Sequence, residues 1–234
     1  MAERQRGRRW IRWVVGAVAV VLVIVVGGPF VYFHFIEKPA PPKLSLDTTP
    51  VPAAATNGPR KPLAGTWTIA NGSIVRYRVK ETLFGQSATA VGETTSVTGS
   101  MTITGTDVSA ASFKVDMTTV HSDRSQRDDQ FQGRIMDTSS YPDATFELTK
   151  PIALAPVPND NVQKAYTATG KLTLHGTTQT ITFTLNARRT VNVIAVQGDI
   201  PITFSDYNID NPSGGPASVG NSGTLEFVLQ MQPS

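Results

Sequence analysis

Residues 170–187 read Gly-Lys-Leu-Thr-Leu-His-Gly-Thr-Thr-Gln-Thr-Ile-Thr-Phe-Thr-Leu-Asn-Ala, and apolar residues alternate with polar ones on both sides of His175-Gly176. Because successive side chains of a β-strand point to opposite faces, each half has one apolar and one polar face. Glycine tolerates the positive φ that a tight connection often needs, so His175-Gly176 marks the turn. We predict an antiparallel hairpin with one side in water.

The same alternation recurs from residue 63 to the end of the chain. Within residues 73–80, for example, Val75, Tyr77 and Val79 share one face and basic residues occupy the other. About eight or nine such strands, joined by clusters of Gly, Asn, Asp and Pro, predict a closed antiparallel barrel or a sandwich. A parallel sheet is disfavoured, because its strands would read as continuous apolar runs.

The N-terminal part of the chain has the pattern of a membrane anchor. Residues 1–12 contain five arginines, and residues 13–36 contain no Asp, Glu, Lys or Arg. As a helix, residues 14–35 would be about 33 Å long, enough to cross a hydrocarbon core of about 30 Å. We predict a basic cytoplasmic tail at 1–12 and a transmembrane helix at 13–36. By the positive-inside rule, the rest of the chain is then extracytoplasmic.

Two other interpretations of this segment are a cleavable signal peptide and a twin-arginine signal. A cleavable signal has a shorter apolar core with small residues just after it, whereas Ala53-Ala54-Ala55 lies far downstream. Arg8-Arg9-Trp10 resembles the twin-arginine pattern, but arginines there also serve as ordinary topogenic charges. The chain has no cysteine, which excludes a lipoprotein anchor, a disulfide framework and a thiolate site.

Residues 37–62 contain seven prolines and few large apolar residues, which predicts an extended linker before a domain at 63–234. Residues 1–62 hold nine of the 21 Lys and Arg but only three of the 18 Asp and Glu. The domain therefore has 12 basic and 15 acidic residues, a net charge of −3. A mildly acidic exported domain is a poor nucleic-acid binder, so nucleic acid is excluded as a partner.

Catalytic and metal-binding motifs are absent from the sequence. It contains no Gly-x-Ser-x-Gly elbow, no His-Glu-x-x-His helix and no phosphate loop. A hydrolase would need His121 or His175 beside a nucleophile, and no spacing suggests one. The charged run at 123–131 lacks the ligand spacing and glycine of a calcium loop. We predict a protein without enzymatic activity, metal or cofactor.

The same charged run has a helical pattern. Ser122 or Asp123 can cap its start, Phe131, Ile135 and Met136 fall on one side, and the Tyr141-Pro142 pair ends it. One interpretation is a solvated helix across a barrel opening, and the other is a lid.

Six short motifs, in one order between residues 63 and 232, resemble the YceI-like family. They are Trp67-Thr-Ile with Ser73-Ile-Val-Arg-Tyr-Arg-Val, Val97-Thr-Gly-Ser-Met-Thr-Ile, Arg127-Asp128 with Phe131, Tyr141-Pro-Asp-Ala-Thr-Phe146, Gly170-Lys-Leu-Thr-Leu-His-Gly-Thr-Thr, and Ile202-Thr-Phe-Ser-Asp-Tyr-Asn-Ile209 with Val219-Gly220. The sequence departs from the family's Arg-Asp-x-His-Leu, having Asp129-Gln130-Phe131 after Arg127-Asp128. The phenylalanine pair that often follows is replaced by Ile135-Met136.

This resemblance implies a lipocalin-like barrel of about eight strands with a short helix near its mouth. It also implies an exported protein with an apolar tunnel for a polyisoprenoid or an isoprenoid quinone, no cofactor and no enzymatic activity. Combined with the anchor predicted from residues 1–36, this gives an expected location at the bacterial cytoplasmic membrane. A homodimer is left open. The alternative is a structural or protein-interaction barrel whose core is completely filled, since small inward residues such as Ala168, Gly170 and Gly198 either leave a channel or relieve crowding at strand bends.

The inward positions of the strands are the candidate ligand-binding residues. They are Val75, Tyr77, Val79, Met101, Phe113, Val115, Phe146, Leu172, Leu174, Phe183, Phe204 and Phe227. At the predicted mouth, Arg127, Asp128 and Gln130 are candidates for head-group contact, although an ion pair or cap that holds the helix is the favoured role of Arg127 and Asp128.

Overall fold

A computed structural model describes residues 13–18, 20–21, 39–47, 59–83, 85–214 and 217–234. The chain forms two compact units, Met1–Ala40 and Pro41–Ser234. In the first unit, residues 13–18 and 20–21 are helical, and the other residues of the predicted transmembrane segment lie outside the described part. Among the residues that are described, none belongs to a helix with the length and hydropathy needed to cross a bilayer.

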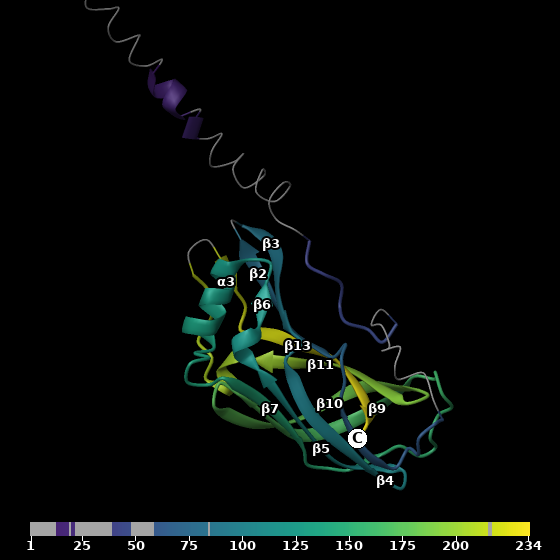
Figure 1. Ribbon diagram of the computed structural model, residues 1–234. Coiled ribbons are helices and arrows are strands. Elements are labelled where there is room, and N and C mark those ends of the chain that lie inside the picture. The colour runs from purple at the N-terminus through teal and green to yellow at the C-terminus, as the bar shows by residue number, and fades with distance from the viewer. Residues whose placement is uncertain (1–12, 19, 22–38, 48–58, 84, 215–216) are drawn as a thin grey trace, which may run out of the picture. The chain divides into compact units, whose positions relative to one another are not determined.

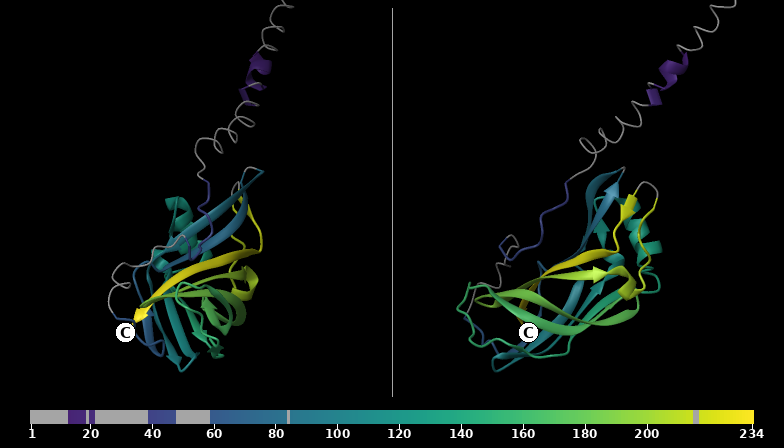
Figure 2. Two further views of the ribbon diagram at one scale, coloured as in Figure 1. Left: turned by 90° about the vertical axis from the view of Figure 1, so that its right-hand side faces the viewer. Right: turned by 180° about the vertical axis from the view of Figure 1, so that it is seen from behind.

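The second unit is built mainly of antiparallel strands (Figures 1 and 2). Its strands are β1 (Gly65–Ile69), β2 (Ile74–Leu83), β3 (Gln86–Thr94), β4 (Val97–Thr104), β5 (Asp107–Asp116), β6 (His121–Ser122), β7 (Asp143–Leu148), β8 (Ile152–Ala153), β9 (Lys164–Leu174), β10 (Thr177–Thr190), β11 (Val193–Thr203), β12 (Ala217–Val219) and β13 (Ser222–Pro233). The helical pieces are the 3₁₀ turns η4 (Met117–Thr119) and η6 (Phe204–Tyr207), the short helix α3 (Ser125–Gln130) and the π-helical turn η5 (Phe131–Ile135) that continues it.

Eight strands close into a barrel in the order β1-β4-β5-β7-β9-β10-β11-β13, and β13 pairs back with β1. The predicted hairpin is the β9–β10 pair, with Phe183 opposite Ala168 and the turn at His175-Gly176. The closed antiparallel barrel is thus confirmed, and the sandwich alternative is wrong. Full closure leaves the ring without a free strand edge.

One end of the barrel differs from the other because β13 changes partners along its length. Residues 231–233 pair with β1, which completes the ring, whereas residues 224–228 pair with β2. The β2–β3 hairpin therefore extends past the ring, with α3 beside it, at the end away from the C-terminus (Figure 1). The opposite end carries the β10–β11 turn and the C-terminal residues of β13.

Part of the predicted linker is docked against the barrel rather than extended into solvent. Residues 41–47, named the strap here, bury Leu44 and Leu46 against Ala195 and Val228 on the outer face of β11 and β13. Two apolar residues spaced two apart point to the same side of an extended chain, which explains why this pair docks together. Arg78 holds the strap by donating to the Pro41 carbonyl at 2.9 Å.

Truncating the strap's anchor should weaken the domain. Leu46 is 3% exposed, so Leu46→Ala is expected to lower the free energy of unfolding by about 2 kcal/mol, the low end for a buried leucine. Urea denaturation measures this change. As a control, Val162→Ala alters a side chain that is 49% exposed and should change stability by less than about 0.5 kcal/mol. Equal unfolding midpoints for the two variants would show that the strap adds nothing to the fold.

Candidate functional site

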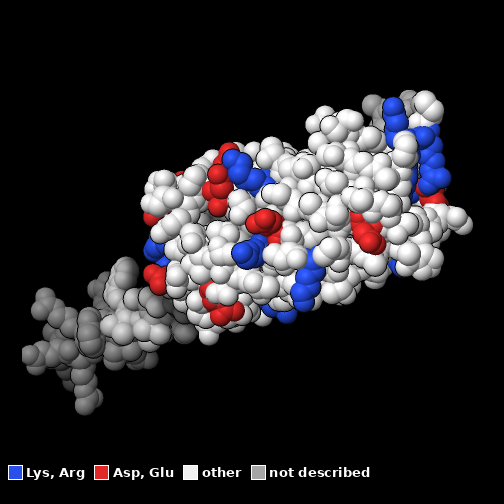
Figure 3. Space-filling model, turned by 90° about the horizontal axis from the view of Figure 1, so that it is seen from below, with Lys and Arg blue, Asp and Glu red and all other residues white. Residues whose placement is uncertain are grey.

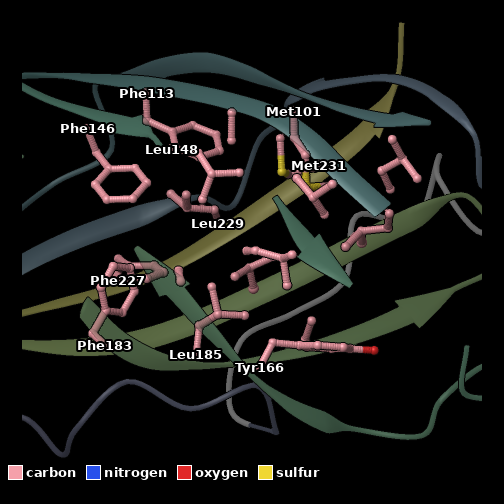
Figure 4. Close-up of a pocket in the computed structure, with 18 of the residues that line it drawn as sticks. Met101, Phe113, Phe146, Leu148, Tyr166, Phe183, Leu185, Phe227, Leu229 and Met231 are labelled. Atoms are coloured by element: carbon pink, nitrogen blue, oxygen red, sulfur yellow. The ribbon is translucent and has the colours of Figure 1, made fainter. Parts of the chain in front are cut away.

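An apolar cavity of about 170 Å³ lies inside the barrel. Its walls come mainly from seven strands of the ring, β4, β5, β7, β9, β10, β11 and β13, together with Val75 of β2. Figure 4 shows side chains from opposite walls facing one another across it. The volume is similar to that of an engineered cavity of about 150 Å³ that stays dry and binds benzene. The side chains of the barrel therefore do not fill its core completely. The alternative of a structural or protein-interaction barrel expected a completely filled core.

Burial along the strands reflects this open interior. On β10, the outward threonines Thr182 and Thr184 are exposed, whereas the inward Ile181, Phe183 and Leu185 are only half-buried. Inward side chains of a closed barrel would be fully buried if they met only other side chains. The alternation predicts the direction of these residues correctly, and the cavity accounts for the remaining exposed surface of Phe183 and Leu185, which line it.

Four phenylalanines gather at one end of the cavity, and their rings lie against the wall (Figure 4). Phe183 meets Phe146 and Phe227 edge to face, with ring centroids 5.7 and 6.0 Å apart. A glycine on a neighbouring strand gives space to three of these rings. Added Cβ atoms would lie 2.8 Å from the Phe113 ring at Gly99, 2.4 Å from the Phe146 ring at Gly170 and 2.6 Å from the Phe227 ring at Gly198.

The glycines therefore decide where the rings go. With no side chain on these glycines, ring atoms of Phe113, Phe146 and Phe227 occupy the space that a Cβ would otherwise take. Phe183 likewise has a small residue opposite it on the neighbouring strand, Ala168 in place of a glycine. The sequence suggested that small residues either leave a channel or relieve crowding, and the structure shows that at these positions they do both.

Eight of the twelve predicted tunnel residues line the cavity: Val75, Met101, Phe113, Val115, Phe146, Leu172, Phe183 and Phe227. The structure places the other four elsewhere. Tyr77 and Val79 lie farther along β2, and Leu174 and Phe204 lie near the β9–β10 turn and η6, where all four pack in the core cluster that includes Phe131. These four side chains point inward as predicted, but they pack with Phe131 in the core at the α3 end of the barrel instead of lining the cavity.

The helix α3 lies at the filled end. The ring of Phe131 stacks on Tyr77 with centroids 4.9 Å apart. Burial raises the pKa of the Tyr77 hydroxyl and has a larger effect on it than the nearby charged residues do. Arg127 pairs with Glu81 at 3.3 Å and with Asp123, and Asp128 accepts the Ser122 N–H at 2.7 Å. Gln130 accepts from Arg134. Arg127 and Asp128 thus hold the helix through an ion pair and a hydrogen bond, which is the role favoured from the sequence. Arg127, Asp128 and Gln130 do not line the cavity.

The cavity reaches solvent at the other end. Its lining there includes Val157, which is 41% exposed, with the half-buried Leu63, Leu154 and Tyr166. At the α3 end, the lining residues Val97 and Ala144 are buried. The opening is thus at the β10–β11 end, opposite to the helix that was predicted to mark it.

Two consecutive arginines of β10 line this opening. Arg188 donates to Asp47 at 2.8 Å and to the Leu46 carbonyl, both on the strap. Arg189 donates to the Val191 carbonyl at 3.0 Å and to the Lys61 carbonyl, with its guanidinium 5.3 Å from the centre of the Trp67 ring. Burial lowers the pKa of the Arg189 guanidinium, and the nearby charge of Arg60 lowers it further.

Sequence reasoning missed these arginines and several apolar lining residues. Ile103, Leu148, Leu185 and Met231 belong to the same alternating runs as the predicted tunnel residues, so taking every apolar member of each run would have included them. No such signal marks Arg188 and Arg189, because charged residues at the end of a strand usually face solvent.

The two histidines of the domain lie outside the cavity. The His175 ring packs edge-on against Tyr141, with centroids 4.7 Å apart. The His121 ring nitrogen Nδ1 lies 3.3 Å from the Thr119 carbonyl. No group of three or more His, Asp or Glu with a metal-binding arrangement occurs within the described ranges.

The fold and the cavity define a closed antiparallel barrel with an apolar interior site that opens at one end. Residues 67–231 match the family model described as YceI-like domain, so the chain belongs to this family. The match covers most of the barrel domain, from β1 to β13.

Solved structures share this fold at low sequence identity. A polyisoprenoid binding domain from Saccharophagus degradans is 18% identical with a TM-score of 0.59, covering 73% of this chain and 99% of its own. Burkholderia cenocepacia BcnA is 21% identical with a TM-score of 0.53, covering 68% and 95%. Campylobacter jejuni YceI protein is 15% identical with a TM-score of 0.50, covering 61% and 84%. No curated protein matches the chain.

Proposed function

We propose that this protein holds or carries a polyisoprenoid or an isoprenoid quinone in its barrel cavity without covalent chemistry. The observation that carries the proposal is the cavity of about 170 Å³ with an almost entirely apolar lining, kept open by rings that lie over glycines. The similar Saccharophagus degradans domain, which is described as polyisoprenoid binding, supports the ligand class. A branched hydrocarbon tail suits such a lining, because each buried methylene gains about 0.8 kcal/mol relative to water.

We further propose that the domain works next to a bilayer, on the extracytoplasmic side of a cytoplasmic membrane. The uncharged run at 13–36 and the arginines before it support an anchor with a cytoplasmic N-terminus. A bilayer is nearly as apolar as the cavity, so transfer of a tail between them is close to neutral. Such a site loads and unloads at a membrane more readily than in water.

The test is to purify the full chain in detergent, extract it with organic solvent and analyse the extract by mass spectrometry. We expect an isoprenoid lipid that is absent from a mock purification. Detergent competes for the site, so uptake of farnesol by the chain in lipid nanodiscs is measured as well, with empty nanodiscs as the blank. Absence of a co-purifying lipid together with no farnesol uptake would contradict the proposal.

A further inference from the structure

Basic side chains surround the opening of the cavity. They are Arg60, Lys61, Lys164, Arg188 and Arg189, named the basic rim here. The described acidic residues at this end are Asp47, Asp160 and, on the β4–β5 turn, Asp107. The rim is therefore positive on a domain whose net charge is negative. Figure 3 shows Lys and Arg side chains gathered at the end that lies away from α3.

Three of the rim cations have no carboxylate partner within ion-pair distance among the described residues. Arg60 pairs with Asp160 at 2.9 Å, and Arg188 pairs with Asp47. Among the described residues, Arg189 donates to two carbonyl oxygens and lies over the Trp67 ring, and Asp160 is a nearby acidic charge without an ion pair to it. Lys164 donates to the Pro156 carbonyl at 2.9 Å and lies over Tyr166, a lining residue. The exposed Lys61 forms no ion pair with any residue that the structure describes. Neutral acceptors satisfy donors of Arg189 and Lys164, and none of the three cations forms an ion pair within the described part of the chain.

The position of Arg189 makes this excess charge relevant to the ligand. Arg188 and Arg189 are the only charged residues in the described lining, and both lie at its open end. From Phe183, in the aromatic part, β10 runs six residues to Arg189, about 20 Å at the rise of a strand. A lipid whose tail reaches the phenylalanines thus places its head group among cations.

Resting on the proposed function, we infer that the preferred ligand is an anionic prenyl lipid, with its phosphate held by the basic rim. A guanidinium binds phosphate through two parallel hydrogen bonds, and a lysine adds a compact positive charge. A neutral quinone or alcohol would leave the half-buried guanidinium of Arg189 without an anion in direct contact, because the nearby Asp160 pairs with Arg60. The lowered pKa of Arg189 agrees with this view, because a bound anion would offset the cost of keeping it protonated.

The experiment compares two ligands with the same tail, farnesyl phosphate and farnesol, on the full chain in lipid nanodiscs, with empty nanodiscs as the blank for partitioning. We expect farnesyl phosphate to bind at least about tenfold tighter, because charge-assisted hydrogen bonds are about twice as strong as neutral ones. Raising the salt concentration should reduce this preference, because ions screen exposed charges.

Variants locate the effect. Arg189→Gln is expected to bring the two affinities to within about threefold, because it removes a charge-assisted contact. Since Arg189 also contacts Trp67, Lys61→Gln provides a second variant at an exposed side chain, and it should weaken farnesyl phosphate without changing farnesol. Lys171→Gln is the matched control, because it removes the same charge from an exposed position of β9 outside the lining and should change neither affinity.

The outcomes separate this inference from the proposed function. Equal affinities in the unmodified chain, or a phosphate preference that survives both rim variants, would overturn the anionic ligand while farnesol binding upholds the carrier function. Failure to bind either ligand would overturn both. Inorganic phosphate should compete at least about 100-fold more weakly than farnesyl phosphate, since it lacks the tail. Competition at equal concentration would indicate a simple anion site and overturn the lipid assignment.

Discussion

Tryptophan in place of Ala111 is expected to weaken farnesol binding by at least about 100-fold, because it fills the space of about one prenyl unit, whose burial is worth about 4 kcal/mol. Ala111 lines the cavity and is opposite Met101 in the β4–β5 pair. The new ring would project into the bore, where no glycine gives it space against the wall. Overpacking should cost at most about 1–3 kcal/mol of stability, so the variant remains folded.

The matched control is Ala110→Trp, one residue earlier on the same strand. Ala110 is exposed and lies outside the cavity lining, so its tryptophan should leave farnesol affinity unchanged. Titration of both variants in nanodiscs, with circular dichroism to verify folding, measures the effect. An unchanged affinity in Ala111→Trp, or an equal loss in both variants, would show that the ligand does not occupy this cavity.

The largest stability effect is expected for Arg78→Met, with a loss of about 3–5 kcal/mol in the free energy of unfolding. The Glu226 side chain is completely buried, and Arg78 holds it with Nε and Nη2 at 2.5 and 3.3 Å from its two carboxylate oxygens. Removing Arg78 leaves a buried charge without its partner. It also removes the hydrogen bond to the Pro41 carbonyl that holds the strap.

A double variant separates these two contributions. Arg78→Met combined with Glu226→Leu removes both charges, so most of the loss due to the unpaired carboxylate should be recovered. What is not recovered reports the contribution of Arg78 to the strap. Urea denaturation of the two single variants and the double variant provides the thermodynamic cycle. A loss of less than about 1 kcal/mol in Arg78→Met would mean that the pair behaves like an exposed one.

Alternation in residues 170–187 and in the other strands is sufficient to predict an antiparallel barrel or sandwich, because a period of two specifies which side chains point inward. The resemblance to the YceI-like family favoured the barrel. The helical pattern at 122–141 likewise predicts α3 and its continuation. The interaction of Arg127 and Asp128 with their own helix region follows from local charge spacing. These features depend on residues that are close in the chain.

Periodicity does not specify how far along the barrel axis each inward residue lies. That depends on strand stagger, which long-range pairings such as β1–β13 and β2–β13 determine. For this reason Tyr77 and Phe204 could be placed inside the barrel from the sequence but not at its filled end. The same pairings place Arg189 at the opening, far in space from the helix that was expected there.

The direction of each side chain is thus a local property of the chain, and the sequence pattern is enough to establish the antiparallel strands and their apolar inward faces. Which end stays open, which glycine lies beneath which ring, and where the strap docks were decided only by the tertiary structure. Each of these features depends on contacts between segments far apart in the sequence, and such contacts form only when the ring closes.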